Sequence, residues 1–269
     1  MAKVNTEIEA RNGSTKLKLT RKQLESVAKI IGVVELQTVF RIKKDKITAK
    51  VVDGAHVSLI ELTWPAEAFQ NYETTEQEIG VNDLKDLLFA VKTAGMNDTI
   101  TIEVDANSEY TISTKYQNAT IKSLDPKSFH EPRSPDFTGH DYAQVFDVPS
   151  DFLRTALTGT GRKSDLIEFG IDGRKIKIFA SNGKGEKWDY NFECDEGETT
   201  KKYSRHAKMT YNGTNLKPLF IQLHGAKAVD ISLRFYTPDG KLGPLEVTAN
   251  LPDGANIKYL LAPRVNDGV

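Results

Sequence analysis

The side chains that could carry acid–base, nucleophilic or metal chemistry are scattered along this chain. Five histidines occur, none with a metal-ligand spacing such as His-Glu-x-x-His. They are His56, His130, His140, His206 and His224. The single cysteine, Cys194, precedes an acidic turn and has no histidine near it, so we interpret it as an inert thiol. One cysteine also excludes an internal disulfide and a cysteine-rich zinc site.

Two further stretches do not change this interpretation. Residues 159–164, Gly-Thr-Gly-Arg-Lys-Ser, lack the G-x-x-x-x-G-K-S/T spacing of a phosphate-binding loop and predict a turn. Residues 195–198 predict a solvated acidic loop, and no G-x-S-x-G nucleophile motif occurs. We therefore expect a protein that is not an enzyme, with no catalytic residue, no metal and no cofactor. The alternative, an enzyme, would show a deep pocket lined by clustered acids, bases or a metal.

Lysine and arginine carry the chemistry that the sequence does favour, which is contact with phosphates. The chain has a net charge of −1, but four segments that we predict to hold helices together carry +10, so the remainder carries −11. These segments are residues 16–31, 81–95, 151–163 and 205–227. The distribution favours one basic face on an otherwise acidic molecule. Phosphate contacts from lysine and arginine weaken with salt and do not read base sequence.

A repeat with a period of about 130 residues positions these segments. One amphipathic helix is predicted from Thr20 and a similar one from Ser150. Each is followed by alternating apolar and polar residues with charged turns, over residues 39–62 and 166–192. Period-two alternation around Asp-Gly and Asn-Gly turns predicts antiparallel hairpins.

A second pair of predicted helices, residues 81–95 and 212–226, completes the repeat. A left-handed stop at a glycine, Gly95 or Gly225, is expected at the end of each. Pro218 is expected in the first turn of the last helix, where a missing N–H costs little. Each helix leads into a strand, so the fold class is α+β, with two tandem copies of a domain of helices on an antiparallel sheet.

The domain boundaries follow from the repeat. We predict a first domain over residues 1–128, an interdomain connector over residues 129–148 and a second domain over residues 149–269. The stretch around the connector, residues 125–149, holds four prolines and no sustained periodicity. Such long segments are often functional, although a passive linker is the alternative.

Each predicted helix has an apolar side for its sheet and a basic side opposite. The basic positions are Arg21, Lys22, Lys29, Lys85, Lys92, Arg154 and Lys217. Solvated surface charge remains the alternative for them. Phe89 departs from the pattern, because an aromatic residue stands where a polar or basic one is expected. Gly159 and Gly161 are expected to end the third helix early, so that Arg162 and Lys163 supply charge from the loop.

Three stretches resemble one known family. Residues 53–73, DGAHVSLIELTWPAEAFQNYE, contain an Asp-x-x-His-Val-x-Leu pattern, and residues 81–95 and 257–265 resemble the family's second helix and its tail, IKYLLAPRV. Pro244 precedes Leu260 at a similar spacing. On these motifs the chain resembles the eukaryotic and archaeal DNA sliding clamps of the proliferating cell nuclear antigen family, over essentially its whole length.

The resemblance implies the DNA clamp fold and a ring of three subunits whose helices line a central hole. Double-stranded DNA would pass through the hole without sequence readout, and the ring would act as a processivity factor in DNA replication and repair. The seven basic positions above would then be the DNA-binding residues. Implied partners are DNA polymerase, the clamp loader and other replication and repair proteins.

The resemblance also implies a pocket for a short partner motif with a glutamine, an aliphatic residue and two aromatics. The matching residues of the first half are Val52, His56, Val57 and Leu59. Those of the connector and the second half are Pro135, Phe137, Pro244, Leu260, Leu261, Ala262 and Pro263. Ordinary core packing is the alternative for Leu260, Leu261 and Pro263.

Ring closure would pair edge strands of neighbouring subunits. We expect these edges near residues 115–124 and 186–194, with subunit contacts from the following side chains. They are Lys115, Ile121, Trp188, Tyr190 and Phe192. A homotrimer is the leading expectation. The first alternative is one subunit of a heterotrimeric ring. The second is a duplicated α+β adaptor that binds peptides but never encircles DNA.

No apolar run approaches the roughly 18 residues of a membrane-spanning helix, and the N-terminus lacks the apolar stretch of a secretory signal. We therefore expect no membrane partner and an intracellular protein. Its place would be the cytoplasm and nucleoid of an archaeon, or the nucleus of a eukaryote.

Overall fold

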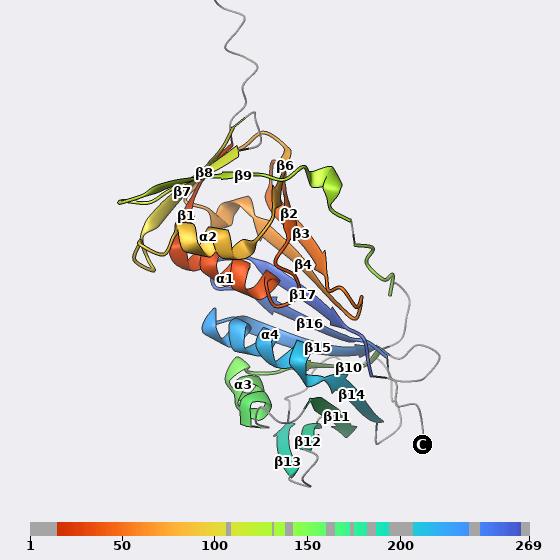
Figure 1. Ribbon diagram of the computed structural model, residues 1–269. Coiled ribbons are helices and arrows are strands. Elements are labelled where there is room, and N and C mark those ends of the chain that lie inside the picture. Colours follow the sequence, from red (N-terminus) through yellow and green to blue (C-terminus); the bar gives the residue numbers. More distant parts are fainter. Residues whose placement is uncertain are drawn as a thin grey trace, which may run out of the picture. The chain divides into compact units, whose positions relative to one another are not determined.

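The computed structural model describes residues 15–105, 109–130, 132–137, 142–159, 165–172, 175–181, 187–193, 207–236 and 243–264 (Figure 1). The chain divides into two compact units. The first unit comprises residues 1–50, 62–131 and 253–255, and the second comprises residues 51–61, 132–252 and 256–269. A segment of the first half of the sequence thus belongs to the second unit. The predicted domain boundaries at 128 and 149 stay a prediction.

The first half of the chain holds two helices and nine strands among its described residues. They are β1 (Thr15–Thr20), α1 (Arg21–Ile31), β2 (Thr38–Ile42), β3 (Lys46–Val52), β4 (Ser58–Pro65), β5 (Asn71–Glu73), β6 (Gln77–Val81), α2 (Leu84–Ala90), β7 (Thr99–Val104), β8 (Glu109–Ser113) and β9 (Asn118–Lys122). Two short 3₁₀ turns, η1 (Ala66–Ala68) and η2 (Pro126–Ser128), follow β4 and β9.

The second half repeats this order among its described residues, except that no described strand corresponds to β5. Its elements are β10 (Tyr142–Asp147), α3 (Ser150–Gly159), β11 (Leu166–Asp172), β12 (Lys175–Ser181), β13 (Lys187–Glu193), β14 (Ala207–Asn212), α4 (Gly213–Gly225), β15 (Val229–Tyr236), β16 (Leu245–Asn250) and β17 (Asn256–Leu261). Helices α1 and α3 begin at Arg21 and Ser150, and α2 and α4 begin at Leu84 and Gly213. Both offsets are 129 residues, which confirms the predicted repeat and the α+β class.

The strands form antiparallel sheets in both units. The first unit has the strand order β5-β1-β7-β8-β9 in one sheet and β4-β3-β2-β6 in the other. The second unit has β13-β12-β11-β14 in one sheet, while β10-β15-β16-β17 continues to β4 in the other. Strands β3 and β4 contribute residues to both units. Among the described strands, β9 and β13 end their sheets, as predicted for residues 115–124 and 186–194.

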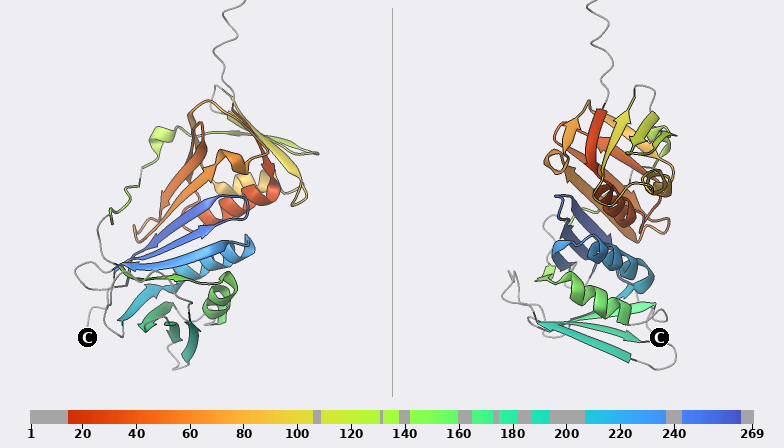
Figure 2. Two further views of the ribbon diagram at one scale, coloured as in Figure 1. Left: turned by 180° about the vertical axis from the view of Figure 1, so that it is seen from behind. Right: turned by 90° about the vertical axis from the view of Figure 1, so that its left-hand side faces the viewer.

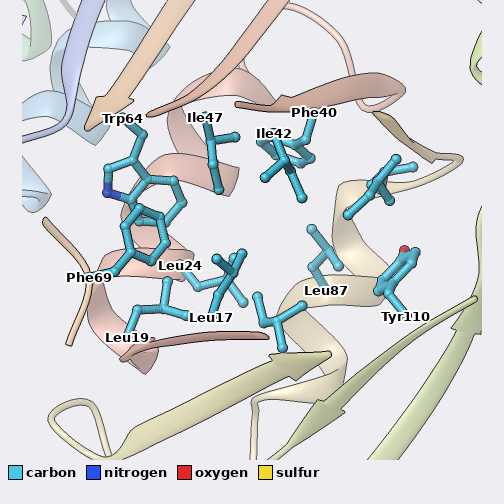
Figure 3. Close-up of a pocket in the computed structure, with 13 residues that line it drawn as sticks. Leu17, Leu19, Leu24, Phe40, Ile42, Ile47, Trp64, Phe69, Leu87 and Tyr110 are labelled. Atoms are coloured by element: carbon cyan, nitrogen blue, oxygen red, sulfur yellow. The ribbon is translucent and has the colours of Figure 1, made fainter. Parts of the chain in front are cut away.

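The core of the first unit lies between its two sheets and its helix pair. Helix α1 buries Leu24, Val27, Ala28 and Ile31, as its spacing predicted, and it contacts α2. An apolar cavity of about 50 Å³ remains in this core (Figure 3). Its lining comes from both sheets and both helices: Leu17, Leu19, Leu24, Phe40, Ile42, Ile47, Trp64, Phe69, Ile79, Val81, Leu87, Ile102 and Tyr110.

The second unit has an aromatic core. Helices α3 and α4 lie side by side (Figure 2). Phe169 contacts Tyr211 and Phe235 at ring-centroid distances of 5.8 and 5.5 Å. The Tyr211 hydroxyl donates to the Gly243 carbonyl oxygen at 2.9 Å, which satisfies its buried polar end. None of the helices described is both long and apolar enough to span a membrane.

The expected glycine stops are correct in one respect only: α4 ends at Gly225 as predicted, but neither expected glycine is left-handed. Helix α2 ends at Ala90, well before Gly95, and neither Gly95 nor Gly225 has a positive φ. At the end of α4 the left-handed residue is Lys227, with φ of 60°. Its N–H donates to the His224 carbonyl and the next N–H, of Ala228, to the Leu223 carbonyl, both at 2.9 Å. This pair of hydrogen bonds is a Schellman motif, and its left-handed residue lies two residues after Gly225.

The position of Pro218 is also corrected. Helix α4 begins at Gly213, capped by the Asn212 side chain on the Thr214 N–H at 2.9 Å, so Pro218 is inside the helix and not in its first turn. At that position the proline removes a hydrogen bond to the Thr214 carbonyl, four residues earlier. By contrast, α3 does end at Gly159 as predicted; Gly161, Arg162 and Lys163 lie outside the described residues, as does Cys194.

Candidate functional site

The start of α1 is fixed by its own sequence and by one loop. Thr20 and Gln23 form a capping box, in which each side chain accepts from the backbone N–H of the other. The next two free amides, of Arg21 and Lys22, donate to the carbonyls of Asp98 and Met96 at 3.0 and 2.9 Å. Backbone carbonyls therefore occupy the helix N-terminus, and any contact with phosphate must come from side chains.

A buried carboxylate lies between two of the predicted DNA-binding residues. Glu25 accepts from Arg21 Nε at 2.5 Å and from Lys29 Nζ at 2.6 Å. Burial would raise the pKa of Glu25, but the hydrogen bonds from Lys29 and Arg21 outweigh it, and the pKa lies below its usual value. Arg21 also donates to the carbonyls of Lys92 and Ala94, which ties α1 to the segment after α2. Arg21 thus has a structural role that the sequence did not indicate.

The other predicted basic residues fall into two groups. Lys85, Lys92 and Arg154 are exposed on or directly after their helices, as the apolar spacing predicted. Lys22 and Lys217 are only half exposed. Burial lowers the pKa of Lys217, and the charge of Asp165 opposes that change. Burial raises the pKa of Asp253, and the positive charge of Lys22 opposes that rise.

Phe89 keeps its anomalous character in the structure. Its side chain on α2 is 70% exposed. It stands four residues after Lys85 within α2, so helical spacing places it on the same side as that lysine, whereas Lys92 follows the end of the helix. Lysine side chains of this kind can attract a phosphate backbone without reading bases. The DNA-binding role of the seven basic residues stays a prediction.

The predicted partner pocket lies wholly within the second unit, although its residues come from three parts of the sequence. The Asp-x-x-His pattern has a local explanation there. The Asp53 carboxylate accepts from the backbone N–H groups of Val57 and Ser58, both at 2.8 Å. His56, with φ of 56°, is the left-handed residue of this turn and donates its N–H to the Asp53 carbonyl at 2.9 Å. The motif therefore shapes the turn into β4.

Four of the predicted pocket residues form one apolar cluster. Leu59 and Leu260 are buried in it, and Val52 and Phe137 pack against them. The fifth member is Tyr236, which the sequence did not indicate. Its ring stacks on Phe137, with centroids 4.3 Å apart and 22° between the planes. The structure thus brings β3, β4, β15, β17 and the connector together at one place.

The remaining predicted pocket residues lie outside this cluster. Leu261 is fully buried, and as the neighbour of Leu260 in β17 it points to the opposite face of the sheet. Pro135 and His56 are exposed. The other four residues lie where strand ends pair. The Val57 carbonyl accepts from the Ala262 N–H at 2.8 Å, and the half-buried Pro263 follows Ala262. The Pro244 carbonyl accepts from the Tyr236 N–H at 3.0 Å.

A buried acid beside the cluster was also missed. Glu246 accepts from the Tyr236 hydroxyl at 2.9 Å and from Arg234 Nη1 at 3.1 Å, and Lys258 Nζ lies 3.4 Å away. Lys258 Nζ is also 3.7 Å from Glu61. Burial raises the pKa of Tyr236, Arg234 opposes this and Glu246 adds to it. Ladder pairing, which the sequence does not reveal, assembles the group, because Glu246 pairs with Arg234 on β15 and Leu260 on β17.

The predicted subunit contacts divide between two edge strands. On β9, Ile121 is half exposed, and Lys115 before that strand lies over the Tyr116 ring at 5.1 Å. On β13, the side chains of Trp188, Tyr190 and Phe192 share one face.

At least two of the β13 side chains pack inside their own unit. The Phe192 ring lies 5.0 Å from Phe152 of α3. A methyl group at Gly159 of the same helix would stand 2.0 Å from the Tyr190 hydroxyl. The backbone of β13, more than these side chains, is therefore the part offered at the sheet edge. The subunit interface itself stays a prediction.

Comparison with known proteins agrees with this architecture. Residues 9–127 match the family described as proliferating cell nuclear antigen, N-terminal domain. A DNA polymerase sliding clamp of Thermoplasma acidophilum is 27% identical over 257 residues, which cover 93% of this chain and 98% of the relative. One of Methanosarcina mazei is 28% identical over 250 residues, covering 92% and 95%.

Solved structures extend the likeness to the fold of both halves. A proliferating cell nuclear antigen of A. fulgidus, with the C-terminal region of FEN-1 bound, has a TM-score of 0.77 at 20% identity and covers 94% of this chain and 100% of its own. A PCNA2–PCNA3 complex from Sulfolobus tokodaii has a TM-score of 0.76 at 19% identity, covering 93% and 99%. The first half of the chain thus matches the N-terminal domain model of the proliferating cell nuclear antigen family, and nearly the whole chain is similar to named DNA polymerase sliding clamps and shares the clamp fold.

Proposed function

We propose that this chain is a DNA sliding clamp: a ring-forming, non-enzymatic processivity factor that encircles duplex DNA and recruits DNA polymerase and other replication and repair proteins. The observation that carries the proposal is the repeat itself. Both pairs of corresponding helices begin 129 residues apart, within a similar order of strands, in a chain that aligns over 93% of its length with a named sliding clamp. An intracellular place beside DNA is part of the proposal.

The basic residues support passage of DNA through a ring. Lys29, Lys85, Lys92 and Arg154 are exposed and belong to helices or their ends, where they can contact phosphates. A closed ring holds DNA by topology, so these contacts need not be tight. Weak contacts without base readout suit a protein that slides, because base-specific binding would hold it at one place.

A charge-reversal experiment tests this role. We compare Lys85→Glu, Lys92→Glu and Arg154→Glu combined with a matched control in which three other exposed lysines, Lys43, Lys44 and Lys127, are reversed. The first variant should lose polymerase processivity and bind DNA with a shallower salt dependence, by about 0.9 in slope for each phosphate that is no longer neutralised. The control should keep both. Unchanged processivity in the first variant would reject DNA encirclement and favour an adaptor that binds peptides only.

The ring is proposed to be a homotrimer. Strands β9 and β13 end their sheets among the described strands, so each offers backbone groups for pairing with another subunit. The complex of PCNA2 with PCNA3 in Sulfolobus tokodaii makes one subunit of a heteromeric ring the second possibility. Light scattering of the purified chain should give three times the monomer mass, with and without DNA. A monomer at micromolar concentration would reject the homotrimer.

The recruitment role is assigned to the Leu59–Tyr236–Leu260 cluster. The relative from A. fulgidus binds the C-terminal region of FEN-1, and an apolar cluster beside an extended connector suits a short peptide. The probe is a labelled synthetic peptide with a glutamine, an aliphatic residue and two aromatics, measured by fluorescence anisotropy.

The test exploits the alternation of β17. Leu260→Ala should weaken peptide binding about tenfold, as expected for an apolar contact of this size. Leu166→Ala, the same substitution at an exposed position of the second unit, should leave the affinity unchanged. Leu261 is left intact because it packs in the core, and thermal unfolding of Leu260→Ala separates folding from binding, since Leu260 is buried as well. Equal affinity of Leu260→Ala and wild type would reject this placement of the pocket.

A further inference from the structure

The connector occupies the proposed partner pocket with its own side chain. Phe137 stacks on Tyr236 at 4.3 Å and packs against the cluster of Leu59, Tyr236 and Leu260. These three side chains are 5%, 6% and 4% exposed. A partner side chain cannot reach apolar surface that is already covered, so docking at this cluster requires the covering group to leave.

A second contact holds the same part of the connector. The Ser134 hydroxyl donates to the Glu61 carboxylate, three residues before Phe137. Glu61 is linked through Lys258 to the buried Glu246, which accepts from the Tyr236 hydroxyl. Residues 134–137, here called the plug segment, are thus attached at a polar end and an aromatic end to one network of the second unit.

We propose that the plug segment is an internal competitor of partner peptides, with Phe137 in the place that an aromatic side chain of the partner takes. This inference rests on the proposed recruitment function and specifies how the site is regulated. Its alternative is that Phe137 is a wall of the pocket, against which the partner packs. The two differ in sign, because removing a competitor strengthens binding whereas removing a wall weakens it.

The size of the effect follows from the stacking that must be broken. If the pocket is open only part of the time, the measured dissociation constant rises by the inverse of the open fraction. A stacked aromatic pair beyond its buried area corresponds to a factor of about 2 to 12 in that equilibrium. Phe137→Ala should therefore bind the peptide about 2- to 12-fold more tightly than wild type.

The first experiment titrates the labelled peptide described above into wild type, Phe137→Ala and Phe89→Ala. The last variant removes an exposed aromatic residue of the first unit and should bind like wild type. If wild type binds the peptide and Phe137→Ala binds it equally or more weakly, the plug segment is not a competitor, and the proposed recruitment function is unaffected. Absence of binding by wild type and Phe137→Ala alike refutes the recruitment function itself. Thermal unfolding of each variant confirms that it is folded.

A second experiment reads the plug segment directly. Hydrogen exchange of the backbone amides of Ser134, Asp136 and Phe137 is followed in wild type before and after saturation with the peptide. Displacement of the plug predicts faster exchange on binding, because the segment is released from Tyr236 and Glu61. A wall that closes over the peptide predicts slower exchange, and that result would overturn the proposal. Ser134→Ala, which removes the polar attachment to Glu61, should tighten peptide binding in the same direction as Phe137→Ala.

Discussion

Replacing Glu25 by glutamine should destabilise the fold and yet strengthen DNA binding. The Glu25 side chain is 7% exposed, and its two partners, Arg21 and Lys29, are 18% and 46% exposed. Glutamine has nearly the same shape and can still accept one hydrogen bond from Arg21. It cannot provide the negative charge that both cations face, so the two effects come from the removal of one charge.

The loss of stability can be bounded from these interactions. A hydrogen bond to a charged group contributes about 1.5–3 kcal/mol, whereas an exposed ion pair contributes less than about 1 kcal/mol. The Arg21 bond is weakened rather than abolished, and the Lys29 bond is close to the surface, so Glu25→Gln should cost about 2 kcal/mol. Urea unfolding at pH 7 measures this cost, and an unchanged m value would confirm that only stability changed.

Glu78→Gln is the matched control. Glu78 accepts from Arg41 Nε at 2.8 Å, in the same kind of pair, but its side chain is 47% exposed. The expected cost is below about 1 kcal/mol. Equal costs for the two variants would refute the claim that burial of Glu25 strengthens its ion pairs.

The pH dependence of the same variant has a definite sign. A glutamate in an unfolded chain has a pKa of about 4.3, and the pKa of Glu25 in the folded protein lies lower. Its stabilisation is therefore complete above the unfolded value and disappears as the pH falls through the folded one. The stability difference between wild type and Glu25→Gln should shrink in acid. A difference that grows below about pH 4 would contradict this sign.

The DNA side of the prediction uses charge alone. Removing one negative charge beside Arg21 and Lys29 raises the local net charge by one per subunit. Non-specific DNA binding should become tighter at low salt, with a steeper dependence on salt concentration. Unchanged or weaker binding by a folded Glu25→Gln variant would show that this part of α1 does not face DNA.

Three substitutions at glycine and proline positions give further tests. Gly159→Ala should lower the free energy of unfolding by about 1–2 kcal/mol, because the new methyl group meets the Tyr190 hydroxyl at 2.0 Å. Gly225→Ala should raise the free energy of unfolding by up to about 1 kcal/mol, because no atom lies within 4 Å of the new methyl group. Equal effects of the two glycine substitutions in urea unfolding would contradict the packing of α3 on β13. Pro218→Ala should stabilise by about 1–2 kcal/mol, because a regained bond to Thr214 exceeds the entropy gained by the unfolded chain. A loss of stability on calorimetry would instead show that the packing of the proline ring dominates.

Periodicity predicted the elements of this fold well, and it did so for a physical reason. The buried stripes of α1 and α4 and the hairpins after α1 and α3 depend on side chains a few residues apart, which a sequence displays directly. Helix ends depend on backbone hydrogen bonds instead. Helix α4 ends at Gly225 as expected, yet the left-handed residue is Lys227, two residues later, and the N–H groups of Lys227 and Ala228 satisfy the last carbonyls.

The site was predicted in part for a related reason. Val52, Leu59, Phe137 and Leu260 were expected together from family resemblance, and the structure unites them. Tyr236 and Glu246 were missed because their partners lie on neighbouring strands, and strand register is set by pairing across the sheet. Arg21 looked like surface charge because nothing local shows that its guanidinium meets the end of another helix.

The alternation of β17 separates two kinds of side-chain position within six residues. Leu261 packs in the interior, whereas Leu260, one peptide bond away, lies on the opposite face in the cluster that we propose for partner binding. Under the proposed recruitment function, substitutions on the Leu260 face would change partner binding while the face of Leu261 stays intact. Insertion of a single residue would instead exchange the two faces of the strand, so it would disturb the interior packing and the proposed partner site together.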